Sequence, residues 1–157
     1  MGIPRPMSNA YLAEPVQTAR AAAVLPASPN WDATPLELAC PGFSYVRFYI
    51  AYTPIALGDD LTFRIEVSPY SADQAGVEDW FQEGDTLLAA PVLAAGADST
   101  NLIQRQHHTY GAIAAATENF EYLFPLAVTV ERIRISCYEA PAGDAGSAHI
   151  IALFGMW

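Results

Sequence analysis

Three histidines could supply nitrogen ligands to a metal ion. They are His107, His108 and His149. If residues 107 and 108 lie in a strand, their side chains point to opposite faces and cannot reach one ion without a bulge. We therefore expect these histidines at a surface or an interface, and we predict neither a metal site nor a cofactor.

Acidic side chains cluster between residues 73 and 85 and could offer oxygen ligands to calcium. Their spacing does not follow that of a calcium-binding loop, so a solvated loop is the first interpretation and calcium the second. The turn Gly58-Asp59-Asp60 is likewise expected to be an ordinary hairpin turn rather than a calcium site. The acidic residues of the loop are Asp73, Glu78, Asp79, Glu83 and Asp85.

Catalytic motifs do not appear in the sequence. It lacks a Gly-x-Ser-x-Gly elbow, a phosphate-binding glycine loop and a His-Glu-x-x-His pair. A glycosidase would need two carboxylates in a geometry that sequence spacing cannot give. Tyr45, Tyr49, Trp80 and Phe81 could form a platform for stacking sugars, although such aromatic residues more often pack in cores and interfaces. We expect a protein that is not an enzyme.

Two cysteines, Cys40 and Cys137, lie in or beside strand-like segments without ligand spacing. Cysteine is among the most often buried residue types, so we expect buried free thiols. A disulfide between the two stays open, because pairing cannot be read from sequence.

The strongest structural signal is alternation of apolar and polar residues in the segments 45–52, 61–68 and 131–139. A period of two predicts strands in a sheet with one dry and one wet face. On the wet face of 61–68 we expect Thr62, Arg64, Glu66 and Ser68. The predicted inward residues are Val46, Phe48, Ile50, Tyr52, Leu61, Phe63, Ile65, Val67, Ile133, Ile135 and Cys137.

Weaker signals mark further strands. The segment 148–154 is apolar on both faces, which favours a buried central strand or one that packs on a partner. About eight short strands without a helical period predict an all-β fold, an antiparallel β-sandwich, and the long connections favour a jelly roll. The additional strands are expected at 35–40, 86–93, 101–110 and 120–124.

Residues 1–35 contain six prolines in an alanine-rich background and are predicted to form an extended N-terminal arm, with the sandwich at 36–157. Within the arm, residues 16–24 favour a short helical turn. A floppy terminus and an arm docked on a neighbouring subunit both remain open. The predicted interface residues are Ile3, Met7, Tyr11, Leu12, Val24, Leu25, Phe154, Met156 and Trp157.

The composition restricts the partners. Hydrophobic residues make up 52% of the chain and charged residues 15%, which favours a homo-oligomer, with a trimer preferred. The net charge is -10 and lysine is absent, so binding to nucleic acid or to anionic membranes is not expected. No segment has the roughly 18 apolar residues of a membrane helix, and we expect the protein to be made in a cytoplasm.

The segments 43–53 and 60–68, with Trp80-Phe81, resemble a pattern of small β-sandwich structural proteins of tailed bacteriophages. The segment 130–136, with the turn 143–146 and 150–155, is similar to their last hairpin. The resemblance covers about residues 43 to 155 and carries no catalytic residues.

This resemblance implies a non-enzymatic virion component, most simply a capsid decoration (cement) protein. Such a protein would assemble in the host cytoplasm, bind the major capsid protein at the capsid surface and bridge capsomers. A carbohydrate- or receptor-binding module of a phage tail is the alternative, and an enzyme is the third.

Overall fold

The computed structural model describes residues 15–70, 80–82, 86–87, 103–104, 107–141 and 146–156. These residues form strands and connecting turns, without a helix among them. The strands are β1 (Val16–Val24), β2 (Leu38–Ala39), β3 (Tyr45–Thr53), β4 (Asp60–Ser68), β5 (Phe81–Gln82), β6 (Thr86–Leu87), β7 (Ile103–Gln104), β8 (His108–Gly111), β9 (Glu118–Pro125), β10 (Arg132–Ala140) and β11 (Ser147–Gly155).

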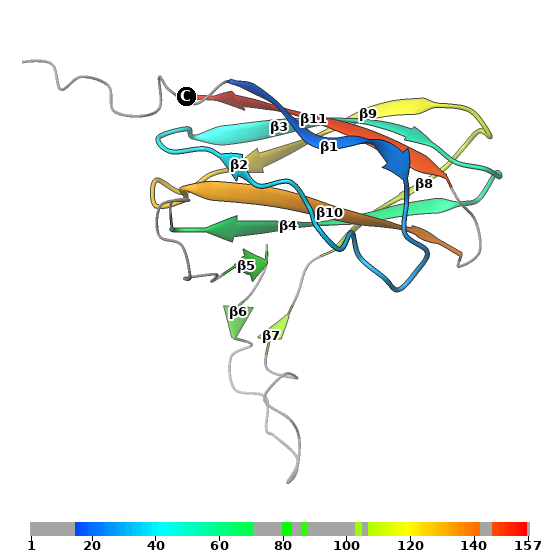
Figure 1. Cartoon of the computed structure of the whole chain (residues 1–157), viewed down its shortest axis with the longest axis horizontal. Helices are drawn as coiled ribbons and strands as arrows, with labels where there is room; N and C mark the ends of the chain where they lie inside the picture. The colour runs from blue at the N-terminus through cyan, green and yellow to red at the C-terminus, as the bar shows by residue number, and fades with distance from the viewer. Residues whose placement is uncertain are drawn as a thin grey trace, which may run out of the picture.

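Two antiparallel sheets pack face to face (Figure 1). Sheet A has the order β1-β11-β3-β9, and sheet B has β2-β10-β4, with β8 and β5 pairing along the free edge of β4. The eight principal strands are β1, β2, β3, β4, β8, β9, β10 and β11. Along the chain, each of them lies in the opposite sheet from the one before it, except that β8 lies in the same sheet as β4. This winding is that of a jelly roll, so the predicted fold class is confirmed.

The strands that adjoin in sequence do not pair as the expected hairpins require. β3 and β4 alternate as predicted, but β3 lies in sheet A and β4 in sheet B. The turn between them, with φ of 95° at Gly58, therefore carries the chain from one sheet to the other and closes no hairpin. β10 and β11 are likewise in different sheets, so the expected last hairpin is also wrong.

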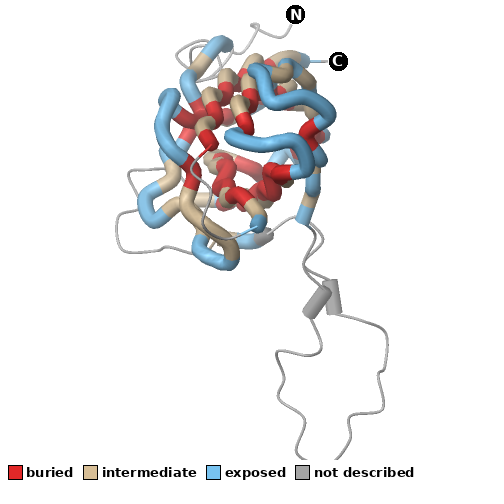
Figure 2. The backbone as a smooth tube through the Cα atoms, turned by 90° about the vertical axis from the view of Figure 1, so that its right-hand side faces the viewer, coloured by how far each residue is buried: buried red, intermediate tan, exposed pale blue. Residues whose placement is uncertain are grey.

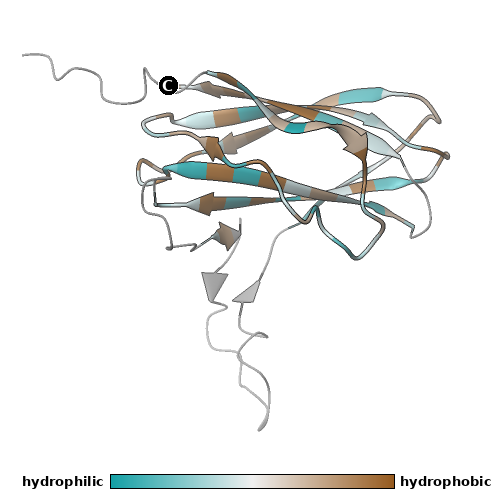
Figure 3. Ribbon diagram, viewed as in Figure 1, coloured by the Kyte–Doolittle hydropathy of each residue, from teal (hydrophilic) through white to brown (hydrophobic). Residues whose placement is uncertain are grey.

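The core lies between the sheets, where the buried residues concentrate (Figure 2). The inward residues predicted on β3, β4 and β10 are all in this core or, for Val67, packed against it. β11 adds Ala148, Ile150, Ala152 and Phe154, and it is a central strand as predicted. Along β10, hydrophilic and hydrophobic residues alternate in the ribbon, as the period of two requires (Figure 3).

Residues 16–24 form β1, an edge strand on β11, and the helical turn expected there is wrong. The register shifts between Thr18 and Arg20 and again between Arg20 and Ala23, so the strand is bulged. The sandwich therefore begins at β1, before the expected boundary at residue 36. Residues 1–14 of the predicted arm lie outside the described residues.

Arg20 holds this bulged strand in place. Its guanidinium makes two hydrogen bonds to Asp32, of 3.0 and 3.1 Å, and also donates to the carbonyl oxygens of Ala23, Val24 and Ala148. Asp32 in turn accepts the backbone N–H of Cys137 on β10. One buried arginine thus links sheet A, the connection after β1 and sheet B.

The minor strands match their predicted positions in part. β2 is shorter than the expected strand at 35–40, and β9 is longer than that at 120–124. The weak strand at 101–110 corresponds to β7 and β8. Of the strand expected at 86–93, only β6 belongs to the described residues.

A buried hydrogen bond connects the two sheets across the core. The Tyr52 hydroxyl donates to Glu139 Oε1 at 2.6 Å, and the Gly146 N–H donates to Glu139 Oε2 at 2.7 Å. Both Tyr52 and Glu139 have an exposed fraction of 0%. Burial, followed by the hydrogen bond to Glu139, raises the pKa of Tyr52, so the hydroxyl remains a donor throughout the ordinary pH range.

We predict that Tyr52→Phe lowers the free energy of unfolding by about 1–3 kcal/mol, because it leaves the buried Glu139 carboxylate short of a donor. Tyr49→Phe, on the same strand but facing outward, is the matched control and should change it by less than about 0.5 kcal/mol. Urea unfolding at pH 7 measures both. Equal effects of the two substitutions would contradict the role given to the Tyr52–Glu139 bond.

Candidate functional site

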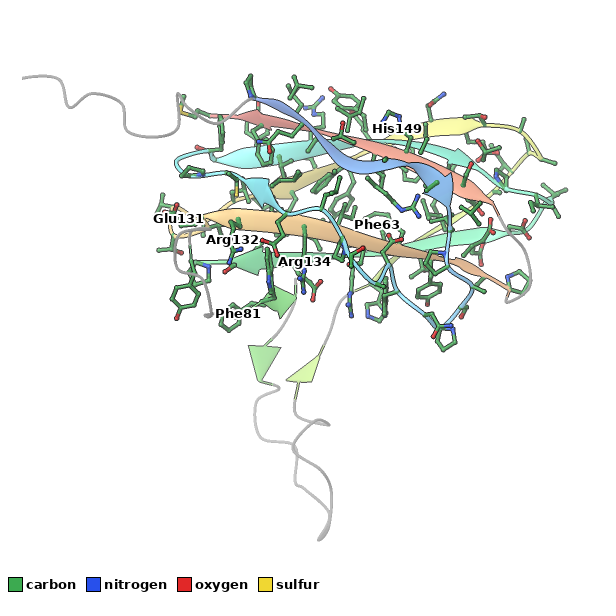
Figure 4. The ribbon with its side chains drawn as sticks, in the orientation of Figure 1. Phe63, Phe81, Glu131, Arg132, Arg134 and His149 are labelled. Carbon is green, nitrogen blue, oxygen red and sulfur yellow. The ribbon has the colours of Figure 1, made fainter. Side chains whose placement is uncertain are left out.

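The candidate functional site is the outer face of sheet A. We call it the A face. On β1, β3, β9 and β11 it consists of the outward side chains Val16, Thr18, Arg47, Tyr49, Ala51, Asn119, Glu121, Leu123, His149, Ile151 and Leu153. Figure 4 shows His149 on this outer side of the sandwich.

Cross-strand pairing brings three apolar side chains of the A face and Arg47 into one row across the four strands. Val16 pairs with Leu153, and Leu153 pairs with Arg47, which in turn pairs with Leu123. Exposed fractions of 54% for Val16, 42% for Tyr49 and 44% for Leu123 show that nothing in the described chain covers them. Among the described residues, the A face is therefore a largely apolar sheet surface without a layer over it.

A shallow hollow of about 380 Å³ lies in the A face. Ala51 is opposite His149 on β11 and opposite Asn119 on β9, so a small side chain sits between two larger ones. Tyr49, Glu121 and Ile151 also line the hollow. The Tyr49 ring lies there with the amide of Asn119, the carboxylate of Glu121 and the imidazole of His149. Such a mixture suits the binding of a ligand better than bond-breaking chemistry.

The charges of the A face balance. Arg47 Nη1 lies 3.3 Å from Glu121 Oε2, and this carboxylate is the first cause that raises the pKa of Arg47. These are the two formally charged residues among those that define the face. A neutral apolar surface thus stands on a chain with a net charge of -10.

On the outer face of sheet B, by contrast, arginine side chains lie against two tryptophan rings. Arg134 lies 4.1 Å and Arg132 5.1 Å from the ring centre of Trp80, and Arg64 lies 4.5 Å from that of Trp31. Figure 4 shows Arg132 and Arg134 on the side of the sandwich away from His149. Cation–π contacts of this kind fix two connecting segments over the sheet.

The prediction that the polar side chains of β4 face water is wrong for three of the four. Thr62, Glu66 and Ser68 point outward as expected, but all three are buried. Glu66 pairs with Arg134, at 2.9 Å, and with Arg64, at 3.8 Å. Glu66 therefore belongs to a charge cluster with Arg64 and Arg134, whose guanidinium groups lie against Trp31 and Trp80.

The three histidines do not gather. His107 packs edge-on against Trp31, with ring centres 5.0 Å apart, whereas His108 stacks on Phe63 and meets the Tyr122 hydroxyl at 3.0 Å. His149 lies on the A face. Within the described ranges, no group of three His, Cys, Asp or Glu side chains could hold a metal ion. The acidic loop 73–85 lies outside these ranges.

Asp59 has a structural role in the turn after β3. It is 3% exposed, and its Oδ2 accepts the N–H groups of Ile55, at 3.2 Å, and Ala56, at 2.7 Å. This is the turn chemistry predicted for Gly58-Asp59-Asp60, in a connection between sheets rather than a hairpin.

The predicted aromatic platform is not one surface. Tyr45 and Tyr49 face outward on sheet A, whereas Trp80 covers arginines of sheet B and Phe81 pairs beside β4. Only Tyr49 of this set lines the hollow.

The predicted interface residues divide between core and surface. Leu25 and Phe154 are 3% and 4% exposed, so they belong to the core, and assigning them to an interface is wrong. Val24 and Met156 are 63% and 55% exposed and stay candidates. Ile3, Met7, Tyr11, Leu12 and Trp157 lie outside the described residues.

The sequence interpretation missed most of the A face as a site. Of its residues, the sequence singles out Tyr49 for a sugar-stacking platform and His149 for a metal trio that is not expected to form. The signal that could have found the face was the segment 148–154, which is apolar on both sides because Ile151 and Leu153 point outward.

Comparison with known proteins gives no relative: no family model, no curated protein and no solved structure matches this chain. In the part of the chain that the structure describes, no helix is long and apolar enough to cross a membrane.

Both cysteines are free and buried, as predicted. Burial raises the pKa of Cys40 from 9.0 to about 12, with a further contribution from Glu131. Burial also raises the pKa of Cys137, where Asp32 adds to the effect and Arg20 opposes it. Neither thiol is therefore activated as a nucleophile.

We predict that a disulfide reagent such as DTNB leaves both thiols of the native protein unmodified at pH 8 and modifies both in denaturant. The raised pKa values also predict that stability is retained below pH 9.0 and declines above it, because the unfolded thiols ionise there and the buried ones do not. Native-state modification of either thiol at the rate of a free cysteine would contradict this.

Proposed function

We propose that this chain is a non-enzymatic structural component of a bacteriophage virion, a capsid decoration protein that acts by docking. The observation that carries the proposal is the A face, an uncovered apolar sheet on an acidic jelly roll. The sequence resemblance to small virion β-sandwich proteins supplies the biological setting.

The docking argument is energetic. Removing apolar surface from water is worth roughly 25 cal/mol per Å², and Val16, Tyr49 and Leu123 each still expose a large part of theirs. The neutral Arg47–Glu121 pair adds little repulsion to such a contact. Elsewhere the negative charge keeps copies in solution apart, so association is directed to this surface.

The fold is compatible with this role but does not carry it. Jelly rolls occur in viral capsid proteins, in lectin domains and in cupins. Fold alone does not give function, so the proposal depends on the surface. The partners would be further copies of the chain and the major capsid protein, with the oligomer bridging capsomers on the outside of the shell.

We predict that Leu123→Asp lowers the number of copies bound per particle at least tenfold at limiting protein concentration, because a buried aspartate loses both apolar contact and hydration. Val128→Asp makes the same change at a residue that is 90% exposed and outside the A face, and it should bind normally. Quantitative mass spectrometry of purified particles measures the copies. Cryo-electron microscopy that shows no density for the chain on shell or tail would overturn the proposal.

A carbohydrate-binding module of a phage tail is the second candidate, favoured by the hollow over Ala51. The Tyr49 ring is 42% exposed there, and Asn119, Glu121 and His149 offer hydrogen bonds around it. An aromatic face beside polar groups is the arrangement that sugar rings use for stacking.

This candidate predicts that Tyr49→Ala weakens binding to a glycan found on an array at least tenfold. Phe81→Ala removes a ring that is 50% exposed and lies outside the A face, and it should leave binding intact. Titration calorimetry with the free glycan gives both affinities. An array without any bound glycan would remove the carbohydrate candidate and leave the docking proposal standing.

A further inference from the structure

We infer that the A face is the contact between two copies of this chain, related by a two-fold axis that lies between their packed A sheets. The inference rests on the proposed docking role of the A face and adds the identity of its occupant. Three properties of the face support a second copy.

Charge is the first property. A basic partner would be drawn to the acidic parts of the surface, whereas the A face offers one positive and one negative side chain, Arg47 and Glu121. A two-fold contact is isologous, so both copies present the same patch. An axis between the two side chains places Arg47 of one copy over Glu121 of the other, and each copy satisfies the charges of its partner.

Shape is the second property. Tyr49 lines the hollow over Ala51 and is 42% exposed, so the same surface carries an accessible ring and a depression. In an isologous contact, the Tyr49 ring of each copy can enter the hollow of the other copy, so the fit is made twice. A partner of unrelated shape would have to supply both a matching pocket and a matching projection.

Size is the third property. Four strands about 4.8 Å apart, each of about nine residues that rise about 3.4 Å, make a flat area on the order of 600 Å². Side-chain relief increases the accessible area beyond this, toward the roughly 800 Å² per partner of a stable complex. Face-to-face packing of two such sheets at about 10 Å is the same arrangement that holds the sandwich itself together.

The first experiment measures the mass of the purified full-length chain by light scattering and sedimentation over about 1–100 µM, the range in which complexes of ordinary affinity form. We expect a dimer. Leu123→Asp should shift the dissociation constant at least tenfold toward monomer, while Val128→Asp should leave it unchanged. Circular dichroism confirms that both variants are folded.

The second experiment exchanges charges across the proposed axis. Arg47→Glu gives a face with two negative charges, and Glu121→Arg gives one with two positive charges, so each variant alone should be monomeric. An equimolar mixture should restore the dimer, as a heterodimer. Rescue by mixing requires that the two residues face each other between copies, so a merely internal role of the ion pair would give none.

Several outcomes would overturn the inference. They are a wild-type chain that is monomeric at 100 µM, a dimer that survives Leu123→Asp, a trimer, and a mixture of the charge variants that stays monomeric. A dimer lost on deletion of residues 1–14, but kept in Leu123→Asp, would assign the contact to the N-terminal segment instead. None of these results decides attachment to a virion, which cryo-electron microscopy of particles with the wild-type chain tests separately.

Discussion

The Arg20–Asp32 contact is the interaction on which the arrangement of the two sheets depends. β1 is alanine-rich and bulged, and it has few side chains with which to hold itself on β11. Arg20 compensates by donating to carbonyl groups of β1 and β11, while Asp32 reaches the backbone of β10. A buried ion pair with its hydrogen bonds satisfied fixes the chain where it leaves sheet A for sheet B. The fourth strand of the A face is thereby held in place.

The remaining arginines then make the two outer faces different. Three of the seven arginines of the chain, at positions 64, 132 and 134, lie on the outer face of sheet B. There they hold tryptophan rings and share carboxylates, so that face is covered by the chain itself. The A face has a single arginine, which is paired within the face. Of the two outer faces, the one that the described residues leave uncovered is therefore the apolar one.

The sequence was enough to predict the side of each long strand that faces the core, because a period of two relates facing directly to residue number. It could not predict which strands pair, since alternation is the same whether the next strand lies in the same sheet or the opposite one. β1 was missed because its alanines show no alternation, and its place depends on Arg20 contacts far apart in sequence. The ion pair of Glu66 likewise depends on Arg134, which is far away in sequence and lies against Trp80.

β11 shows how the core and the candidate site are joined in one element. Its inward residues Ile150 and Ala152 are fully buried, while its outward neighbours Ile151 and Leu153 remain partly open to water. A central strand needs apolar residues on its inner side only, so the outer ones are not explained by folding of a single copy. Alternate positions of the same strand therefore serve two different contacts. The inner set holds the sandwich together, and the outer set is available to whatever packs on the A face.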